Sequence, residues 1–416
     1  MASHAGGLSE TDPQRVGFSA DRLQRIDRLL QEYVDKKRIP GAVALVARNG
    51  QLVYHKGIGQ DDTEAGKAMK REAIFRITGL TKLATTIAVM MLYEEGKLLL
   101  DDPIARYIPE FRNAKVLGRF NPRDSSFTSV PAKRQITIRN LLNHTSGISY
   151  PIVGLGPKEA MAIYQKNRIP NGVGTPSANL AASVKTLAQL PLMHQPGEKF
   201  TYGLNTDVLG YLVELVSGQK LDQFLRTRLF EPLGMKDTYF YLPAEKANLL
   251  TPLYTEDTTR TVKKMPAQMN PDYPKAAGTY LSGGSGLCST ALDYAALVQM
   301  ILNQGEFNGK RILSPMSVRM MATNQIGSLA IGARRFGFGM ALATSQEASL
   351  RPVSEGTMEW SGILGTTFFA DPKENLIGIL FINKYPNSFG DVDDKFKVLV
   401  YQALTGPETS SFQAIR

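Results

Sequence analysis

Apolar and polar positions follow two spacings near the start of this chain, one typical of helices and one of strands. Over residues 20–37 the apolar positions recur every three or four residues, which predicts an amphipathic helix. Ala42–Ala47 is a short apolar run that predicts a buried strand, and Gln51–His55 predicts a second one. Asn49-Gly50 lies between them and is typical of a hairpin turn. The chain therefore begins with a predicted helix and two paired strands.

The middle of the chain has mainly the helical spacing, and strand patterns return towards its end. The sequence predicts helices at residues 81–95, 138–144, 205–216, 291–302 and 393–404. Thr366–Ala370 and Leu376–Ile382 are strand-like runs separated by a turn. Strands near both ends with helices between them predict an α+β fold, in which an antiparallel β-sheet is flanked by helices and carries a mostly helical insertion.

The same pattern predicts how the chain divides into domains. We expect a discontinuous sheet domain of residues 15–75 and 280–410, and a mainly helical domain of residues 76–279. Stretches rich in Pro, Gly and Ser around residues 113–134 and 150–184 are expected to form loops that shape the mouth of a pocket. A chain of 416 residues is long enough to bury a sizeable core in such a plan.

Composition and charge narrow the function classes. The net charge is +10, but the basic residues are spread along the chain without a nucleic-acid-binding motif, so no nucleic-acid partner is expected. No apolar run reaches the ~18 residues that a membrane span needs. The four histidines lie far apart, so no metal site is expected. Residues 1–7 lack the pattern of a signal peptide, which leaves open a cytoplasmic protein and an exported one whose signal has been removed.

The candidate chemistry begins where Thr78-Gly79-Leu80-Thr81-Lys82 leads into a predicted buried helix. This stretch resembles the serine β-lactamase superfamily, which includes class C β-lactamases, penicillin-binding proteins, family VIII carboxylesterases and lovastatin-type acyltransferases. There a Ser-x-x-Lys motif starts the helix, and the lysine lies beside the nucleophilic hydroxyl because residues three apart share a helix face. The resemblance implies a penicillin-binding-protein-like transpeptidase fold, a catalytic Lys82, and Gly79 at the nucleophile position, where it supplies no hydroxyl.

A second stretch, Gly197–Asn205, resembles the next motif of the same superfamily. The resemblance implies that Tyr202 is the catalytic proton shuttle, since a neighbouring lysine ammonium favours a phenolate. β-Lactamases carry an asparagine two residues after this tyrosine. Here Leu204 stands at that place and Asn205 follows it, which is closer to the esterases and acyltransferases. Asn205 is expected to contact the substrate.

A third stretch, Glu359–Gly365, resembles the strand motif that lines the pocket in this superfamily. β-Lactamases usually have Lys-Thr-Gly there, whereas family VIII esterases often have Trp-x-Gly. Trp360, the only tryptophan of the chain, and Gly362 are therefore expected to bind the substrate, and a neutral aromatic wall favours uncharged esters over penicillins. The resemblance implies an oxyanion hole made by the backbone N–H groups of Gly79 and Ile363.

Further stretches extend the resemblance over roughly residues 15–405. They are Ile39–Gly41, Leu98–Pro103, Ile138–Gly147, Phe230–Met235 and Gly283–Ser289. His144 lies in one of them, where the superfamily has a structural turn, so we do not expect it to be a general base. The resemblance implies an enzyme without a cofactor that acts on a small ester or acyl substrate through an acyl-enzyme. The sequence gives no indication of the oligomeric state.

Gly79 leaves several interpretations of the function open. The chain is either a serine carboxylesterase or acyltransferase whose nucleophile has been replaced, and so an inactivated variant that still binds substrate, or a natural non-catalytic ligand-binding protein with the same pocket. A rewired enzyme, in which Thr78, Thr81 or Lys82 supplies the reacting group, is the third interpretation. A hydrolase of the β-lactamase or peptidase type is an alternative for the substrate class.

Overall fold

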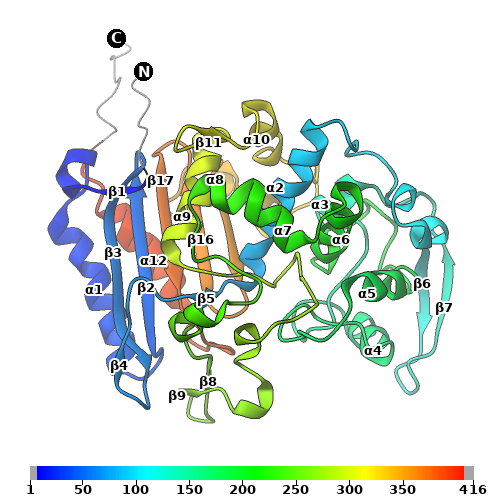
Figure 1. The fold of residues 1–416 in the computed structure, drawn as a ribbon, viewed down its shortest axis with the longest axis horizontal. Helices are drawn as coiled ribbons and strands as arrows, with labels where there is room; N and C mark the ends of the chain where they lie inside the picture. The colour runs from blue at the N-terminus through cyan, green and yellow to red at the C-terminus, as the bar shows by residue number, and fades with distance from the viewer. Residues whose placement is uncertain (1–6, 407–416) are drawn as a thin grey trace.

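A mixed sheet forms the centre of the structure, a computed structural model that describes residues 7–406 (Figure 1). Its strand order is β1-β3-β2-β17-β16-β15-β14-β13, with β4 paired to β3. All neighbouring strands are antiparallel except β1 and β3. The strands are β1 (Ser9–Glu10), β2 (Gly41–Arg48), β3 (Gln51–Asp62), β4 (Lys67–Ala68), β13 (Arg334–Phe336), β14 (Ala341–Ala343), β15 (Met358–Gly362), β16 (Thr366–Asp371) and β17 (Leu376–Phe381). The predicted α+β fold with an antiparallel sheet is therefore confirmed, with one parallel pair at its edge.

The predicted N-terminal hairpin is present and lies near one edge of the sheet. Asn49 and Gly50 have φ values of 54° and 73°, which suits a tight turn between twisted strands. β2 is buried along its whole length, as expected of a strand with both faces covered. It pairs with β3 on one side and with β17 on the other. Strands from the two ends of the chain therefore pair within one sheet.

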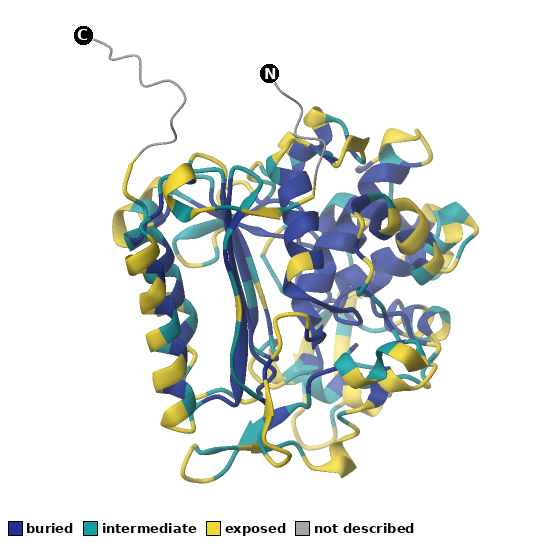
Figure 2. Cartoon of the chain, turned by 60° about the vertical axis from the view of Figure 1, so that its left-hand side comes forward, coloured by how far each residue is buried: buried dark blue, intermediate teal, exposed yellow. Residues whose placement is uncertain are grey.

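Helices cover both faces of this sheet. α1 (Ala20–Asp35) and α12 (Asp391–Gln402) share one apolar core with strand residues such as Val46 and Leu380. α2 (Thr81–Glu94) and α9 (Ala291–Leu302) belong to the larger core on the other face. Figure 2 shows the inner strands and helices as mostly buried, and the exposed residues lie on outer helix faces and loops. The spacing of apolar residues over 291–302 suggests an amphipathic helix with one exposed face, but α9 is buried along most of its length because it packs against the sheet.

The remaining α-helices are mostly short, with α6 the longest of them, and most lie within residues 76–279. The helices are α3 (Ile138–Leu142), α4 (Lys158–Lys166), α5 (Leu180–Leu187), α6 (Asn205–Ser217), α7 (Leu221–Leu225), α8 (Glu231–Leu233), α10 (Pro315–Met321) and α11 (Ser345–Leu350). The small strands are β5 (Phe75–Arg76), β6 (Lys115–Phe120), β7 (Phe127–Pro131), β8 (Tyr254–Glu256), β9 (Val262–Lys264), β10 (Cys288–Ser289), β11 (Glu306–Phe307) and β12 (Lys310–Arg311).

Two segments predicted as loops contain regular structure instead. Within residues 113–134, β6 and β7 form an antiparallel hairpin, whose mostly exposed side chains gave little apolar alternation to detect. Residues 150–184 contain α4 and the start of α5. The Asn179 side chain accepts a hydrogen bond of 2.9 Å from the Ala182 N–H and so caps α5. Capping and packing against the core stabilise short helices that a pattern rich in Gly and Pro conceals.

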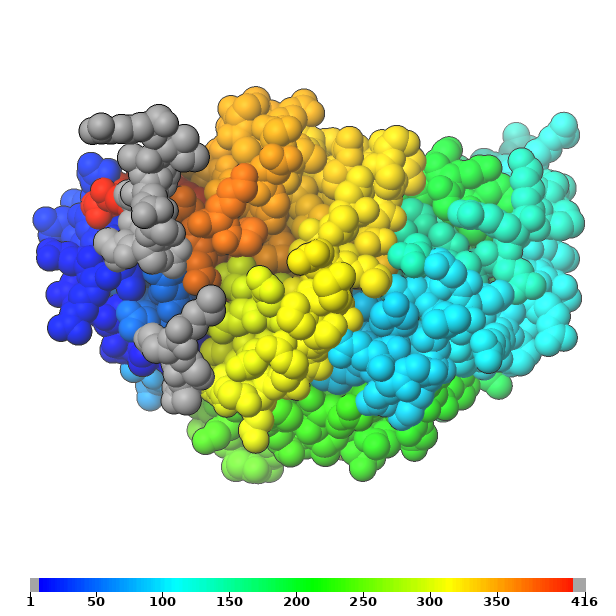
Figure 3. All heavy atoms as spheres, turned by 90° about the horizontal axis from the view of Figure 1, so that it is seen from above, coloured from blue at the N-terminus to red at the C-terminus, as the bar shows by residue number. Residues whose placement is uncertain are grey.

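The sheet end and the helical end of the molecule lie opposite each other. Viewed from above, N-terminal residues in blue and C-terminal residues in orange and red lie together at one end, and the cyan residues of the β6–β7 region lie at the other (Figure 3). Most of the N-terminal segment considered as a signal peptide lies outside the described residues. Among the helices of residues 7–406, none is long and apolar enough to cross a membrane.

Candidate active site

The turn before α2 places Gly79 and Lys82 in the interior. β5 pairs with β10, and the chain then passes through a short 3-10 helix, η2 (Thr78–Leu80), into α2. Thr78 has a φ of 39°, in the left-handed region that residues with a side chain rarely adopt. Gly79 is buried, and Lys82 is only 1% exposed.

The Lys82 ammonium is surrounded by oxygen atoms and aromatic rings. Its Nζ donates to Tyr150 Oη at 3.1 Å and to the Gly284 carbonyl at 2.7 Å. It also lies 4.6 Å from the centroid of the Tyr202 ring, within the range of a cation–π contact. Burial acts against the charge, but Tyr150 and Tyr202 outweigh it and raise the pKa of Lys82. Lys82 is therefore held as a cation next to both tyrosines.

Tyr150 is a member of this group that sequence reasoning missed. It is 1% exposed, and its ring centroid is 5.2 Å from that of Tyr202. Burial raises its pKa, against the lowering effect of Lys82. Its only sequence signal is its place shortly after the family-like stretch Ile138–Gly147. A lone tyrosine in that context does not indicate which group it will contact.

Tyr202 and Trp360 meet beside Gly79, as the family motifs predict. Tyr202 precedes α6, and its Oη accepts a hydrogen bond of 3.3 Å from Trp360 Nε1 on β15. The same Oη lies 3.2 Å from the place where a β-carbon on Gly79 would stand. The Trp360 ring packs against Tyr202 at 5.3 Å and against Phe336 at 5.2 Å. Three distant segments of the chain therefore converge on position 79.

These residues line a cavity of about 280 Å³. Its lining consists of Gly79, Tyr150, Ile152, Leu155, Val173, Phe200, Tyr202, Ser285, Ile331, Trp360, Ser361 and Ile363. None of these residues is charged, so the wall suits a neutral, largely apolar ligand. Besides the two tyrosines, Ser285 offers a hydroxyl: the residue is 6% exposed, and its Oγ has no hydrogen-bond partner among the described residues.

The end of β15 supplies a backbone donor and a close contact. Ile363 lines the cavity, and its N–H has no acceptor within residues 7–406, so it is available to a ligand oxygen. Gly362 is not part of the lining. Any side chain on it would collide with the Thr78 and Thr366 hydroxyls. Glycine at position 362 therefore allows β15 to approach η2 closely.

Gly79 is also packed against this strand. A β-carbon on Gly79 would collide with the Ser361 carbonyl oxygen. A backbone carbonyl gives way only if the strand moves, so a larger residue at position 79 requires β15 to shift. The structure around Gly79 is thus adapted to the absence of a side chain.

Asn205 lies outside the cavity, although a substrate contact was expected of it. It is fully buried, and its Nδ2 donates to His144 Nδ1 at 2.9 Å while its Oδ1 accepts from Ser146 Oγ. Burial lowers the pKa of His144 well below its usual value, so the ring is neutral. In this structure Asn205 therefore fixes the turn that contains His144.

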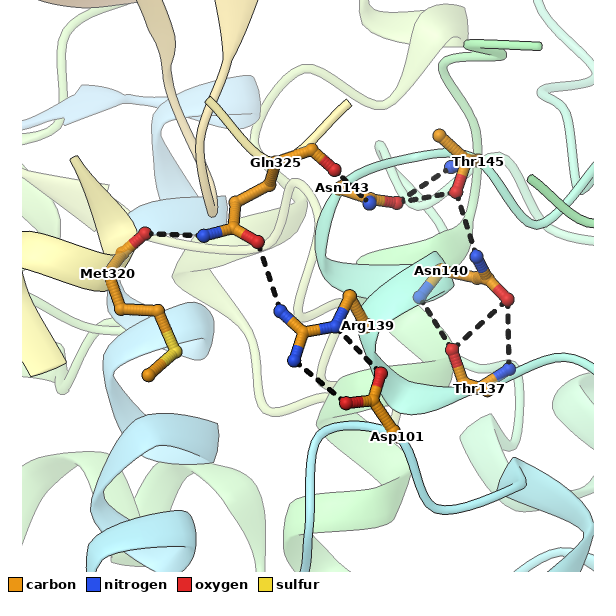
Figure 4. A network of polar contacts seen from close by, with 8 residues as sticks. All are labelled: Asp101, Thr137, Arg139, Asn140, Asn143, Thr145, Met320 and Gln325. Carbon is orange, nitrogen blue, oxygen red and sulfur yellow. Dashed lines mark hydrogen bonds and ion pairs between the residues drawn. The ribbon is translucent and has the colours of Figure 1, made fainter. Parts of the chain in front are cut away.

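A polar network fixes the same turn from its other side (Figure 4). Asn140 Nδ2 donates to Thr145 Oγ1 at 2.9 Å, and Thr145 Oγ1 donates to Asn143 Oδ1 at 2.7 Å. Asn143 Nδ2 in turn donates to the Gln325 carbonyl at 2.8 Å. Gln325 also accepts from Arg139 through its side-chain oxygen. The network anchors the segment that leads to Tyr150.

Neither threonine of the rewired interpretation lines the cavity. Thr78 Oγ1 is buried without a partner among the described residues and lies beneath Gly362. Thr81 Oγ1 accepts a hydrogen bond of 3.1 Å from the Leu287 N–H. A ligand in the cavity therefore meets neither hydroxyl.

The comparison with known families agrees with these motifs. The model of the beta-lactamase family matches residues 26–402, most of the chain. The chain belongs to the beta-lactamase family. The superfamily expected from the motifs around Lys82, Tyr202 and Trp360 is confirmed by this match.

Relatives within this family include esterases. Protein Rv1367c of Mycobacterium tuberculosis is 36% identical over 375 residues, which cover 86% of this chain and 89% of that protein. Esterase EstB of Burkholderia gladioli is 29% identical over 416 residues and 96% of each chain. Among solved structures, EstCE1, described as a hydrolase with promiscuous acyltransferase activity, has a TM-score of 0.78 at 28% identity, over 92% of this chain and 98% of its own.

Proposed function

We propose that this beta-lactamase family member binds uncharged carboxylic esters in the cavity at Gly79, and that Gly79 prevents the acyl-enzyme step. The observation that carries the proposal is that the polar groups of a catalytic site surround position 79, where glycine has no side chain. Lys82, Tyr150 and Tyr202 form one connected group, and the Ile363 N–H has no acceptor among the described residues. The uncharged lining and the similarity to EstB and EstCE1 favour an ester as the ligand.

Each group has a role towards a bound ester in this proposal. The carbonyl oxygen accepts hydrogen bonds from the N–H groups of Gly79 and Ile363, and Trp360 packs against the acyl or alcohol part. Tyr202 is the group that exchanges a proton with a hydroxyl at position 79, and Lys82 is the cation beside it. Because position 79 lacks that hydroxyl, no bond to the carbonyl carbon forms by this route.

The test restores the hydroxyl and compares it with a matched side chain. Gly79→Ser and Gly79→Ala both add the β-carbon that meets Ser361, so each is expected to cost about 1–3 kcal/mol of stability. Gly79→Ser is expected to hydrolyse p-nitrophenyl butyrate at a rate at least on the order of a hundredfold above the background rate of Gly79→Ala. Nitrocefin turnover is expected to stay weak, because the cavity wall has no cation for a drug carboxylate.

A folded Gly79→Ser variant that is as inert as Gly79→Ala would contradict the esterase assignment. Turnover by the unchanged chain that is lost in Lys82→Ala would instead favour the rewired enzyme. Circular dichroism and urea unfolding of each variant separate loss of chemistry from loss of fold.

A second function, ester binding without any chemistry, is favoured by the close contact between Gly79 and Ser361. Because β15 leaves no room for a side chain at position 79, the site suits ligand binding without a nucleophile better than catalysis by a serine. In that case the unchanged chain binds the ester more tightly than either variant, whereas the first function predicts that Gly79→Ser gains turnover.

A further inference from the structure

A buried carboxyl group lies close to Lys82 and has no part in the proposed ester chemistry. Asp207 is in the first turn of α6, and only 1% of it is exposed. Neither of its carboxylate oxygens has a well-formed hydrogen bond to a described residue. An ionised carboxylate in such a place is costly unless a positive charge lies nearby.

Lys82 supplies that positive charge across Gly284. The place where a β-carbon on Gly284 would stand is 2.6 Å from Asp207 Oδ2 and 3.5 Å from Lys82 Nζ. The two hydrogen-bond partners of Lys82, Tyr150 and the Gly284 carbonyl, are uncharged phenol and amide groups. Both buried groups therefore lie close to the space that a side chain on Gly284 would fill.

The Ser282–Ser285 turn, which contains Gly284, is itself held by hydrogen bonds. The Ser285 N–H donates to Ser282 Oγ at 3.0 Å, and Thr85 Oγ1 donates to the Gly283 carbonyl at 2.8 Å. Burial raises the pKa of Asp207 to about 6, although the Ser282 hydroxyl, Lys82 and the Gly284 N–H all act to lower it.

We propose that Asp207 is the counter-charge of Lys82 and acts as a positioning residue that holds the lysine ammonium beside the tyrosines. The other titratable groups that face Asp207 are Tyr150 and Tyr280, whose pKa values burial raises, so both are neutral phenols near pH 7. The proposal concerns the chain as it is and does not depend on ester binding or turnover.

The experiment is a double-mutant cycle of Lys82→Met and Asp207→Asn, in which urea unfolding measures the stability of each variant. At about pH 7.5, where Asp207 is ionised, Lys82→Met leaves a buried carboxylate unpaired and is expected to lower the unfolding midpoint sharply. Adding Asp207→Asn removes that charge and is expected to restore part of the loss. At about pH 5 most of the Asp207 carboxyl is protonated, so the restoration is expected to shrink.

Asp293 provides a matched control. It is 8% exposed, lies on α9, and burial raises its pKa to about 6 as well. Its carboxylate is bound by the Thr238 hydroxyl and the Asp237 N–H instead of facing Lys82. The effect of Asp293→Asn is therefore expected to add to that of Lys82→Met, with no restoration at either pH.

A second measurement covers the case in which Lys82→Met does not fold. In Asp207→Asn alone, the Lys82 side chain is expected to lose its proton at a lower pH than in the unchanged chain. The NMR signal of its ε-carbon, recorded as a function of pH, measures this titration. Asp293→Asn is expected to leave that titration unchanged. Additive effects in the cycle, or an unchanged Lys82 titration in Asp207→Asn, would overturn the proposal.

Discussion

Trp360 is a natural reporter of ligand binding, because it is the only tryptophan of the chain and lines the cavity with Gly79. We expect phenyl butyrate to change the fluorescence of the unchanged chain in a saturable way, since the ligand replaces water against the indole ring. Ser285→Leu places a branched side chain in a cavity of about 280 Å³ and is expected to weaken binding. The loss should be about tenfold or more.

Ser285→Ala is the control for this prediction. It removes the hydroxyl without filling the cavity, so the fluorescence response is expected to persist with at most a modest loss of affinity. No saturable response in the unchanged chain, or equal binding by Ser285→Leu, would show that the ligand does not occupy this cavity.

Short motifs predicted the residues that line the cavity better than those behind it. Gly79, Tyr202 and Trp360 each stand in a stretch with a family pattern, and the fold brings all three together. Tyr150 and Asp207 acquire their contacts only through tertiary placement, which no local pattern encodes. The same reasoning predicted that Asn205 contacts the substrate. Its motif is shifted by one residue, and its amide donates to His144 instead of reaching the cavity.

At the scale of elements, the turn after α3 depends on buried side-chain hydrogen bonds. Asn143→Ala removes a donor to the Gln325 carbonyl and an acceptor for Thr145, and Asn143 is 4% exposed. Because the substitution leaves buried hydrogen-bonding groups without partners, it is expected to cost about 1–3 kcal/mol of stability. Urea unfolding measures this loss.

Asp101→Ala is the contrast within the same network (Figure 4). Asp101 pairs with Arg139 at 2.7 Å, but its side chain is 72% exposed. Solvent screens such a pair, so the loss is expected to stay within about 1 kcal/mol. Equal losses in Asn143→Ala and Asp101→Ala would show that the turn does not depend on the buried part of the network.

Elements with a strong apolar pattern were predictable, whereas elements stabilised by their surroundings were not. β2 and β3 follow from an apolar run and an Asn-Gly turn, and α6 ends at Gly218, whose φ is 71°. β6 and β7 instead present mostly exposed residues, so only their pairing with each other defines them. α5 depends on its Asn179 cap, and α4, which has no side-chain cap, depends on packing that composition conceals.

At the scale of the whole molecule, buried carboxyl groups of two kinds change the stability in opposite directions with pH. Burial raises the pKa of Asp207 and Asp293 from 3.8 to about 6. These groups favour the folded state when protonated, so their contribution is lost as pH rises from about 4 to about 6. In Glu256, burial is outweighed by the ion pair with Lys384, which lowers the pKa. That contribution is present above about pH 4.5 and is lost as pH falls.

The two effects together predict a stability maximum near about pH 4.5 and a decline up to about pH 6. Each raised carboxyl group accounts for a loss on the order of 2–3 kcal/mol across that decline. Urea unfolding between about pH 4 and pH 8 measures the profile. Asp293→Asn is expected to gain stability relative to the unchanged chain as pH rises, and Lys384→Met to lose most where Glu256 is ionised. A stability that increases steadily up to neutral pH would mean that Asp207 and Asp293 ionise in the folded protein at ordinary pH values.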